Sequence, residues 1–328
     1  NNMYVNAVSG IAELHTFLGQ YDKAESLYIK AKKVIDALKP KDSLQSAMNL
    51  YGIGQFYRQL GQYQKAESLL LEAKKQLTQK YGDSSYLITK ALNGLALLYS
   101  DKSEYDKALP LYMQAEQIFR KYPRETHPDY SVAINNLASV YTSLGQYDEA
   151  DSLYKKAIEL RRKISGEENS DYASVLNNLA GLYFYKKEYT KAEPLYIRSK
   201  EIRESVLRKE HPDYANSLSN LGLLYLAMGN YDKAESLLLS NSQITINNLT
   251  NTFSILSEDG KGKYLANNIK ITGTNNSLIY HFPTASREFI INSFNQLLLL
   301  KSLSLSDTRN MLNAVNNSPD SGLVKLFT

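Results

Sequence analysis

The sequence predicts an all-α protein, a solenoid of helical hairpins that continues into a helical extension. Three observations predict this fold class. The stretch GQYDKAESLY at residues 19–28 returns almost unchanged as GQYDEADSLY at residues 145–154. A tyrosine recurs every 42 residues, and each unit carries apolar residues at helical spacing. A fixed period of about 20 to 50 residues is typical of proteins in which each unit stacks on the next.

Two columns of residues define the repeat. The recurring tyrosines are Tyr21, Tyr63, Tyr105, Tyr147, Tyr189 and Tyr231. Three residues after each tyrosine stands an alanine, namely Ala24, Ala66, Ala108, Ala150, Ala192 and Ala234. The helices of a hairpin approach closely only where a side chain is small. We therefore interpret the alanine column as the contact inside each hairpin.

Each unit is predicted to form two helices joined by a tight turn. In unit five the first helix is expected at residues 171–185, DYASVLNNLAGLYFY, and the second at residues 189–207. Both segments repeat their apolar residues with the period of an α-helix. An aspartate stands where the N-cap of the first helix belongs in units four to six. The expected caps are Asp129, Asp171 and Asp213.

Glycine occupies the turn between the two helices in four units, at positions 19, 61, 145 and 229. We expect it to close the turn with a positive φ, which costs glycine little. Ser103 and Lys187 take this place in units three and five. Those two turns are therefore expected to be strained or differently closed.

The repeats are predicted to span residues 1–245 as six tandem hairpins, and residues 246–328 to form a helical capping or connecting segment. After residue 240 tyrosine nearly vanishes and asparagine becomes frequent. Residues 237–257 keep a helical pattern and suit a cap on the exposed end of a solenoid. Further helices are expected at residues 286–305 and 307–316.

Composition and motifs exclude several function classes. The 38 basic and 34 acidic residues alternate without a block of like charge, so we expect no direct nucleic-acid or membrane partner. The chain has no cysteine and its four histidines are scattered, which argues against a metal site. No HExxH, GxSxG, P-loop or Rossmann pattern is present, so we expect no enzyme and no cofactor. Without a membrane-spanning apolar run or a signal peptide, a cytoplasmic location is expected.

These motifs resemble a known family. GQYDKAESLY, together with NNLASVY at residues 135–141 and NNLAGLY at 177–183, is similar to tetratricopeptide repeats. The 42-residue period and the linker HPDY, at residues 127–130 and 211–214, resemble the kinesin-light-chain type of that repeat. The resemblance implies a right-handed superhelix whose first helices line a concave groove and whose second helices form the convex outside. Such grooves bind peptides or partner proteins, and the family has no catalytic activity.

Under this resemblance, polar residues of the first helices are the candidate binding residues. One column, spaced by 42 residues, holds Asn136, Asn178 and Asn220. A carboxamide offers a donor and an acceptor, which suits the backbone of an extended peptide. In related repeats an asparagine at this column holds peptide main chain or a terminal carboxylate. Glycine fills the column in units one to three, so the predicted row covers units four to six only.

A second row of candidates precedes the first by one residue. It holds Asn135 and Asn177, with Asn93 in unit three. The alternative is that these amides tie neighbouring first helices together and contact no partner. Cationic residues that could clamp a peptide carboxylate are not evident, since Val132, Ser174 and Asn216 stand one turn earlier.

The C-terminal part carries a second resemblance. FSILSEDGKGKYLANN at residues 253–268, FNQLLLLKSLSLSDTRNML at 294–312 and NSPDSGLVKLF at 317–327 follow one another. This order is similar to the segment between the repeats and the caspase-like CHAT domain in bacterial proteins that combine the two. The resemblance implies a regulatory arm whose peptidase, with its histidine and cysteine, would follow Thr328. The alternative is a stand-alone adaptor that joins partners with no enzyme attached.

Overall fold

The computed structural model describes residues 2–18, 20–37, 43–121 and 127–254. Within these ranges it is all-helical, which confirms the predicted fold class. The helices are α1 (Asn2–Phe17), α2 (Tyr21–Ala37), α3 (Ser43–Gln59), α4 (Tyr63–Tyr81), the 3-10 turn η1 (Tyr86–Ile88), α5 (Thr89–Asp101), α6 (Tyr105–Lys121), α7 (Pro128–Ser143), α8 (Tyr147–Ser165), α9 (Ser170–Tyr185), α10 (Tyr189–Val206), α11 (Pro212–Ala227) and α12 (Tyr231–Ser254).

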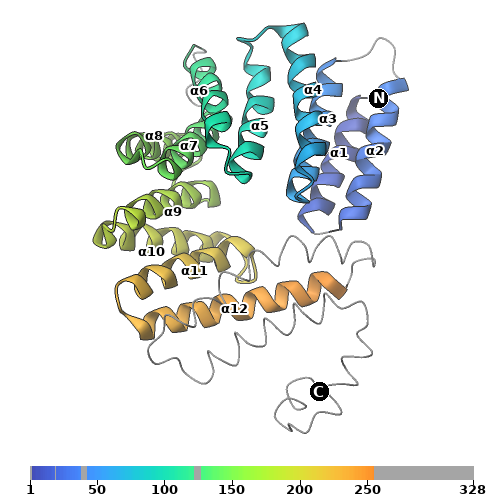
Figure 1. Ribbon diagram of the computed structural model, residues 1–328. Helices are drawn as coiled ribbons and strands as arrows, with labels where there is room; N and C mark the ends of the chain where they lie inside the picture. The colour runs from blue at the N-terminus through green and yellow to red at the C-terminus, as the bar shows by residue number, and fades with distance from the viewer. Residues whose placement is uncertain (1, 19, 38–42, 122–126, 255–328) are drawn as a thin grey trace.

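The helices form six consecutive hairpins, and the second helix of every hairpin begins at the recurring tyrosine. Figure 1 shows that the hairpins turn progressively along the chain, so that α11 and α12 cross the direction of α1 and α2. Among the described helices, first helices of consecutive units pack against one another, whereas second helices make no comparable contacts with each other. The first helices therefore lie on the inside of the curve, where the groove was expected.

The alanine column lies inside each hairpin as predicted, with all six side chains fully buried. It faces a second column of small residues that the sequence analysis missed, on the first helix of each unit. This column holds Ala12, Gly54, Ala96, Ala138, Ala180 and Gly222. Both columns leave the backbones free to approach, and larger side chains fill the space beside them.

The identity of the small residue follows the size of its neighbour. Where the second helix places a tyrosine seven residues after the recurring one, the first helix has alanine; where it places leucine, the first helix has glycine. A Cβ atom at Gly222 would lie 2.9 Å from Cγ of Leu238, and one at Gly54 would lie 2.8 Å from Cγ of Leu70. A leucine branches close to its own backbone, so it occupies the space that the methyl group of alanine would need.

The turns without glycine close in the same way as the others. Ser103 and Lys187 have φ values of 59° and 60°, beside 69° for Gly61 and 74° for Gly145. The amide after Ser103 donates to the carbonyl of Tyr99 at 2.8 Å, which matches the bond from Gln62 to Tyr57 at 2.9 Å. Of the two expected alternatives the structure therefore has strain, because residues with a Cβ are held in the left-handed region.

We expect Ser103→Gly to raise the free energy of unfolding by about 0.5–1 kcal/mol, because the turn keeps its geometry and loses its steric penalty. Urea denaturation of the purified chain would measure the change. The reverse substitution, Gly145→Ser, is the matched control and should lower stability by a similar amount. Equal stability for both variants would show that the left-handed turn carries no such penalty here.

The predicted helix caps are wrong by two residues. The caps of α7 and α11 are His127 and His211, whose Nδ1 atoms accept the backbone N–H of the aspartate two positions on at 3.2 and 3.1 Å. The cap of α9 is Asn169, which accepts from the amide of Tyr172 at 2.9 Å. The aspartates lie inside the first turn instead, where their charge complements the positive end of the helix dipole. The HPDY linker is therefore a helix start, with proline at the first helical position.

Consecutive units meet along a seam, the interface between the second helix of one unit and the first helix of the next. Hydrogen bonds between tyrosine and carboxylate groups stabilise these seams. A tyrosine near the end of a first helix donates to an acidic residue near the start of the preceding second helix in four of the five seams. The pairs are Tyr57–Glu25 at 2.7 Å, Tyr99–Glu67 at 2.8 Å, Tyr183–Asp151 at 2.6 Å and Tyr225–Glu193 at 2.8 Å. Between units three and four no such bond is found among the described residues, because Leu109 takes the place of the acidic residue and packs against the same apolar cluster as Tyr141.

The seam between units three and four is fastened at its opposite end. Tyr130, at the start of α7, donates to Glu116, near the end of α6, at 3.2 Å. The next seam is fastened at both ends, since Arg161 donates to Asp171 at 2.8 Å in addition to the Tyr183 bond. Within the part of the chain that the structure describes, the seam after unit three therefore differs from the next one in being hydrogen bonded at one end only.

The last helix, α12, runs through residue 245 to Ser254, beyond the expected end of the repeats. The helices expected at residues 286–305 and 307–316 lie outside the described residues. None of the helices described is both long and apolar enough to cross a membrane.

Candidate functional site

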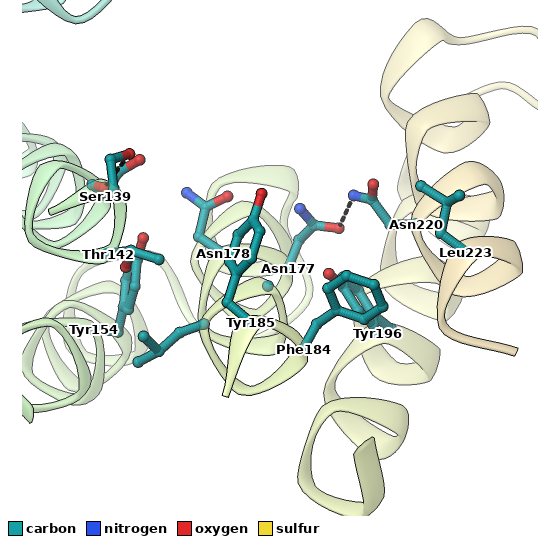
Figure 2. Close-up of a pocket in the computed structure, with 13 residues that line it drawn as sticks. Ser139, Thr142, Tyr154, Asn177, Asn178, Phe184, Tyr185, Tyr196, Asn220 and Leu223 are labelled. Atoms are coloured by element: carbon teal, nitrogen blue, oxygen red, sulfur yellow. Dashed lines mark hydrogen bonds between the residues drawn. The ribbon is translucent and has the colours of Figure 1, made fainter. Parts of the chain in front are cut away.

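A hollow of about 280 Å³ lies on the inner face of units four to six. The first helices α7, α9 and α11 supply most of its wall, and α8 and α10 each contribute one tyrosine from behind. In Figure 2 the amides of Asn178, Asn177 and Asn220 form a row across the hollow, with aromatic rings beside and below them. The lining residues are Ser139, Thr142, Ser143, Tyr154, Asn177, Asn178, Gly181, Leu182, Phe184, Tyr185, Tyr196, Asn220 and Leu223.

The asparagines link successive first helices by hydrogen bonds. Asn178 donates from Nδ2 to Oδ1 of Asn135 at 3.1 Å, and Asn220 donates to Oδ1 of Asn177 at 2.9 Å (Figure 2). Asn135 in turn donates to Oδ1 of Asn136 at 3.3 Å. The bonds join residues 43 positions apart and not 42, so they run diagonally between the two predicted columns.

These bonds leave part of each amide unused. A carboxamide has two N–H donors and an oxygen that accepts twice. Asn178 and Asn220 each use one donor in the ladder, and Asn177 uses its oxygen. All three are half-buried and line the hollow. Tying the helices together and contacting a ligand are therefore compatible roles for the same side chains.

The remaining candidates lie in different surroundings. Asn135 and Asn136 are half-buried on α7 and belong to the ladder, outside the lining of the hollow. Asn93 is only 8% exposed, and its Oδ1 has no hydrogen-bond partner among the described residues. It lies in the interior of unit three and presents little surface to a partner.

Sequence reasoning missed the aromatic part of the hollow. Tyr185 is 65% exposed on α9, at a position where the neighbouring units have Ser143 and Ala227. Phe184 is half-buried next to it, and the two rings meet edge to face with centroids 6.0 Å apart. The signal for it is a break in the repeat column, since an aromatic residue stands where the neighbouring units have small ones.

The hollow carries no formal charge, because none of its lining residues is acidic, basic or histidine. Its two deep tyrosines are held in the neutral form. Burial raises the pKa of Tyr154 to about 12, against the opposing effect of hydrogen bonds with Thr142 and Ser139. Burial also raises the pKa of Tyr196. The site therefore offers neutral hydrogen-bonding groups and aromatic surface.

Comparison with known proteins agrees with this architecture. A search of curated proteins finds no match. The structure of BtubC (BKLC) from P. vanneervenii is 26% identical with a TM-score of 0.56, over 69% of this chain and 89% of BtubC. A putative kinesin light chain from P. anserina is 24% identical with a TM-score of 0.52, over 61% of this chain and 94% of the other.

A third similar structure is NprR in complex with its cognate peptide NprX. It is 18% identical with a TM-score of 0.57, over 92% of this chain and 88% of NprR, and shows a shared fold. The family model of the tetratricopeptide repeat matches residues 4–79, 86–163 and 171–240. The matched segments cover most of the sequence and all six hairpins. This chain belongs to the tetratricopeptide repeat family.

Proposed function

We propose that the protein is a non-catalytic interaction scaffold whose concave groove binds an extended peptide segment of a partner protein. The observation that carries this proposal is the row of three carboxamides, Asn178, Asn177 and Asn220, along the hollow in units four to six. The row lies on the inner helices, where a bound chain can touch several units at once.

The chemistry of the row suits a peptide backbone. An extended chain presents an alternating series of N–H and C=O groups, and the free donors and acceptors of the amides can pair with both. The ladder bonds hold the side chains in place before a ligand arrives, which reduces the entropy lost on binding. NprR, which shares this fold, was solved with a peptide, and that supports the proposal at the level of the fold.

We expect Asn178→Ala and Asn220→Ala to weaken peptide binding by about tenfold each, since each removes one or two ligand hydrogen bonds. The probe is a phage-displayed library of random 12-residue peptides selected on the intact chain. Affinities of the selected peptides for the variants would then be measured by isothermal titration calorimetry.

The matched control is Asn49→Ala. Asn49 on α3 donates to the hydroxyl of Ser9 on α1 at 3.4 Å, so this bond also bridges two first helices. It joins units one and two, away from the hollow. All three variants are expected to lose about 1 kcal/mol or less in unfolding free energy. Unchanged affinity in the groove variants, with the fold intact, would assign the asparagines to structure alone.

Within this proposal the scaffold is the sensing arm of a larger protein that also contains a CHAT domain. The support is the second resemblance, which falls almost entirely on residues 255–328, outside the described residues. The runner-up is a stand-alone adaptor. Sequencing the reading frame past Thr328 distinguishes them: a domain with a spaced histidine and cysteine supports the arm, and a stop codon supports the adaptor.

A further inference from the structure

The deep tyrosines of the second helices follow a rule that unit five breaks. Position seven after the recurring tyrosine is tyrosine in units one, three, four and five. In the first three of these units the facing first helix places a hydroxyl residue beside the phenol, where it lowers the pKa of the tyrosine against the larger effect of burial. The pairs are Tyr28 with Thr16, Tyr112 with Ser100, and Tyr154 with Thr142.

Unit five replaces the hydroxyl partner with Phe184. The tyrosine at this position, Tyr196, is only 6% exposed, and no hydrogen bond to its hydroxyl is found among the described residues. The Tyr196 hydroxyl opens on the hollow, so water or a ligand there can take the place that a hydroxyl residue holds in the other units.

The same unit opens the space in front of this hydroxyl. Gly181 stands where the neighbouring units have Ser139 and Leu223. A Cβ at Gly181 would lie 3.5 Å from the Tyr196 hydroxyl oxygen and no other atom would come within 4 Å, so the hydroxyl faces the hollow across the bare backbone of α9. Tyr196 itself lines the hollow, beside Phe184 and below the row of amides (Figure 2).

We propose that the hollow is a specificity pocket for one uncharged, polar-tipped side chain of the bound peptide, whose tip hydrogen bonds with Tyr196. The inference rests on the proposed function, and it adds which side chain the groove selects. Phe184, Tyr185 and Leu223 contact the apolar body of that side chain, and the Tyr196 hydroxyl pairs with an amide or hydroxyl at its end. A charged tip is rejected, because the lining offers no opposite charge to offset its loss of water.

The first test needs no ligand. Tyr196→Phe removes only the unpaired hydroxyl, so the thermal unfolding midpoint of the free protein is expected to stay constant or rise. Tyr112→Phe, the matched control, breaks the pair with Ser100 and is expected to lower the midpoint by about 2–4 °C. An equal fall for Tyr196→Phe would mean that its hydroxyl already has a partner inside the protein, and would overturn the inference.

The second test uses peptides selected from the phage-displayed random 12-residue library. They are expected to share one neutral polar side chain, and to bind Tyr196→Phe about fivefold to tenfold more weakly than the unchanged protein. Phe184→Thr, which restores the internal partner found in unit four, should weaken binding similarly while raising the unfolding midpoint. Tyr112→Phe should bind as the unchanged protein does. Replacing the shared side chain by its charged isostere should cost about tenfold or more in affinity.

The outcomes separate this inference from the proposed function. If the selected peptides lose affinity for Asn178→Ala and Asn220→Ala but bind Tyr196→Phe normally, the specificity pocket is overturned. The proposed peptide-binding groove is then still supported. Peptides that share a charged side chain at one position also overturn the pocket. If the library yields no binder, the proposed function and the pocket both fall.

Discussion

Gly222→Ala is expected to destabilise the sixth hairpin by about 1–3 kcal/mol, although alanine is the better helix former. The new methyl group would lie 2.9 Å from Cγ and 3.0 Å from Cδ2 of Leu238, closer than carbon atoms pack. The backbone oxygen of Ala234 would also lie only 3.4 Å from the new methyl group. The two helices must therefore move apart, and urea denaturation monitored by circular dichroism would register the loss.

A control and a rescue make this prediction specific. Gly181→Ala makes the same change in α9, where only the Tyr196 hydroxyl lies near at 3.5 Å, and should be neutral or stabilising by about 1 kcal/mol. Combining Gly222→Ala with Leu238→Tyr recreates the pair found in four other units. The double variant should recover about 0.5 kcal/mol or more beyond the sum of the single changes. Strict additivity would mean that glycine and leucine are not coupled.

The protein is expected to lose stability steeply between pH 10 and pH 12. Burial and the adjacent carboxylates raise the pKa values of Tyr99, Tyr183 and Tyr225 to about 12. Their ordinary value is about 10, so the folded state favours the neutral phenol, which donates to the carboxylate. The stabilisation is complete below pH 10 and disappears as pH rises through the folded pKa. Thermal unfolding midpoints recorded from pH 8 to 12 would show the fall.

The seam tyrosines can be separated from the other buried tyrosines by substitution. Changing Tyr99, Tyr183 and Tyr225 to phenylalanine should lower stability at pH 8 by about 1 kcal/mol each and make the alkaline fall shallower. Tyr141→Phe is the matched control, because Leu109 stands in the acidic position and no hydrogen bond from Tyr141 to a carboxylate is found among the described residues. We expect it to change neither quantity. A midpoint that stays level up to pH 12 would contradict the assignment.

Much of the fold was predictable because the residues that recur in every unit are those that pack between its helices. A column conserved in register through six copies marks a contact that every unit needs, and the structure buries the alanines accordingly. The caps were predicted wrongly because an aspartate near a helix start suits either the cap or the first turn. Histidine acts as the cap in α7 and α11 through Nδ1, a role that the sequence pattern does not single out.

The site was predictable only in part. The 42-residue spacing predicts that Asn178 and Asn220 lie on one face. In the structure each of them hydrogen bonds with an asparagine of the other predicted column in the preceding unit. The exceptional hydroxyl of Tyr196 could not be found until Phe184 was known to face it across the hairpin. Departures from a repeat become informative once the structure shows which columns touch.

The seam between units three and four is hydrogen bonded where the start of α7 meets the end of α6, through Tyr130 and Glu116. At its other end, near Tyr141 and Leu109, no matching hydrogen bond is found among the described residues. Apolar packing still holds that end, because Leu137 and Val140 of α7 share a buried cluster with Ala108 and Tyr112 of α6. The three-amide row lies wholly within units four to six, on one side of this seam.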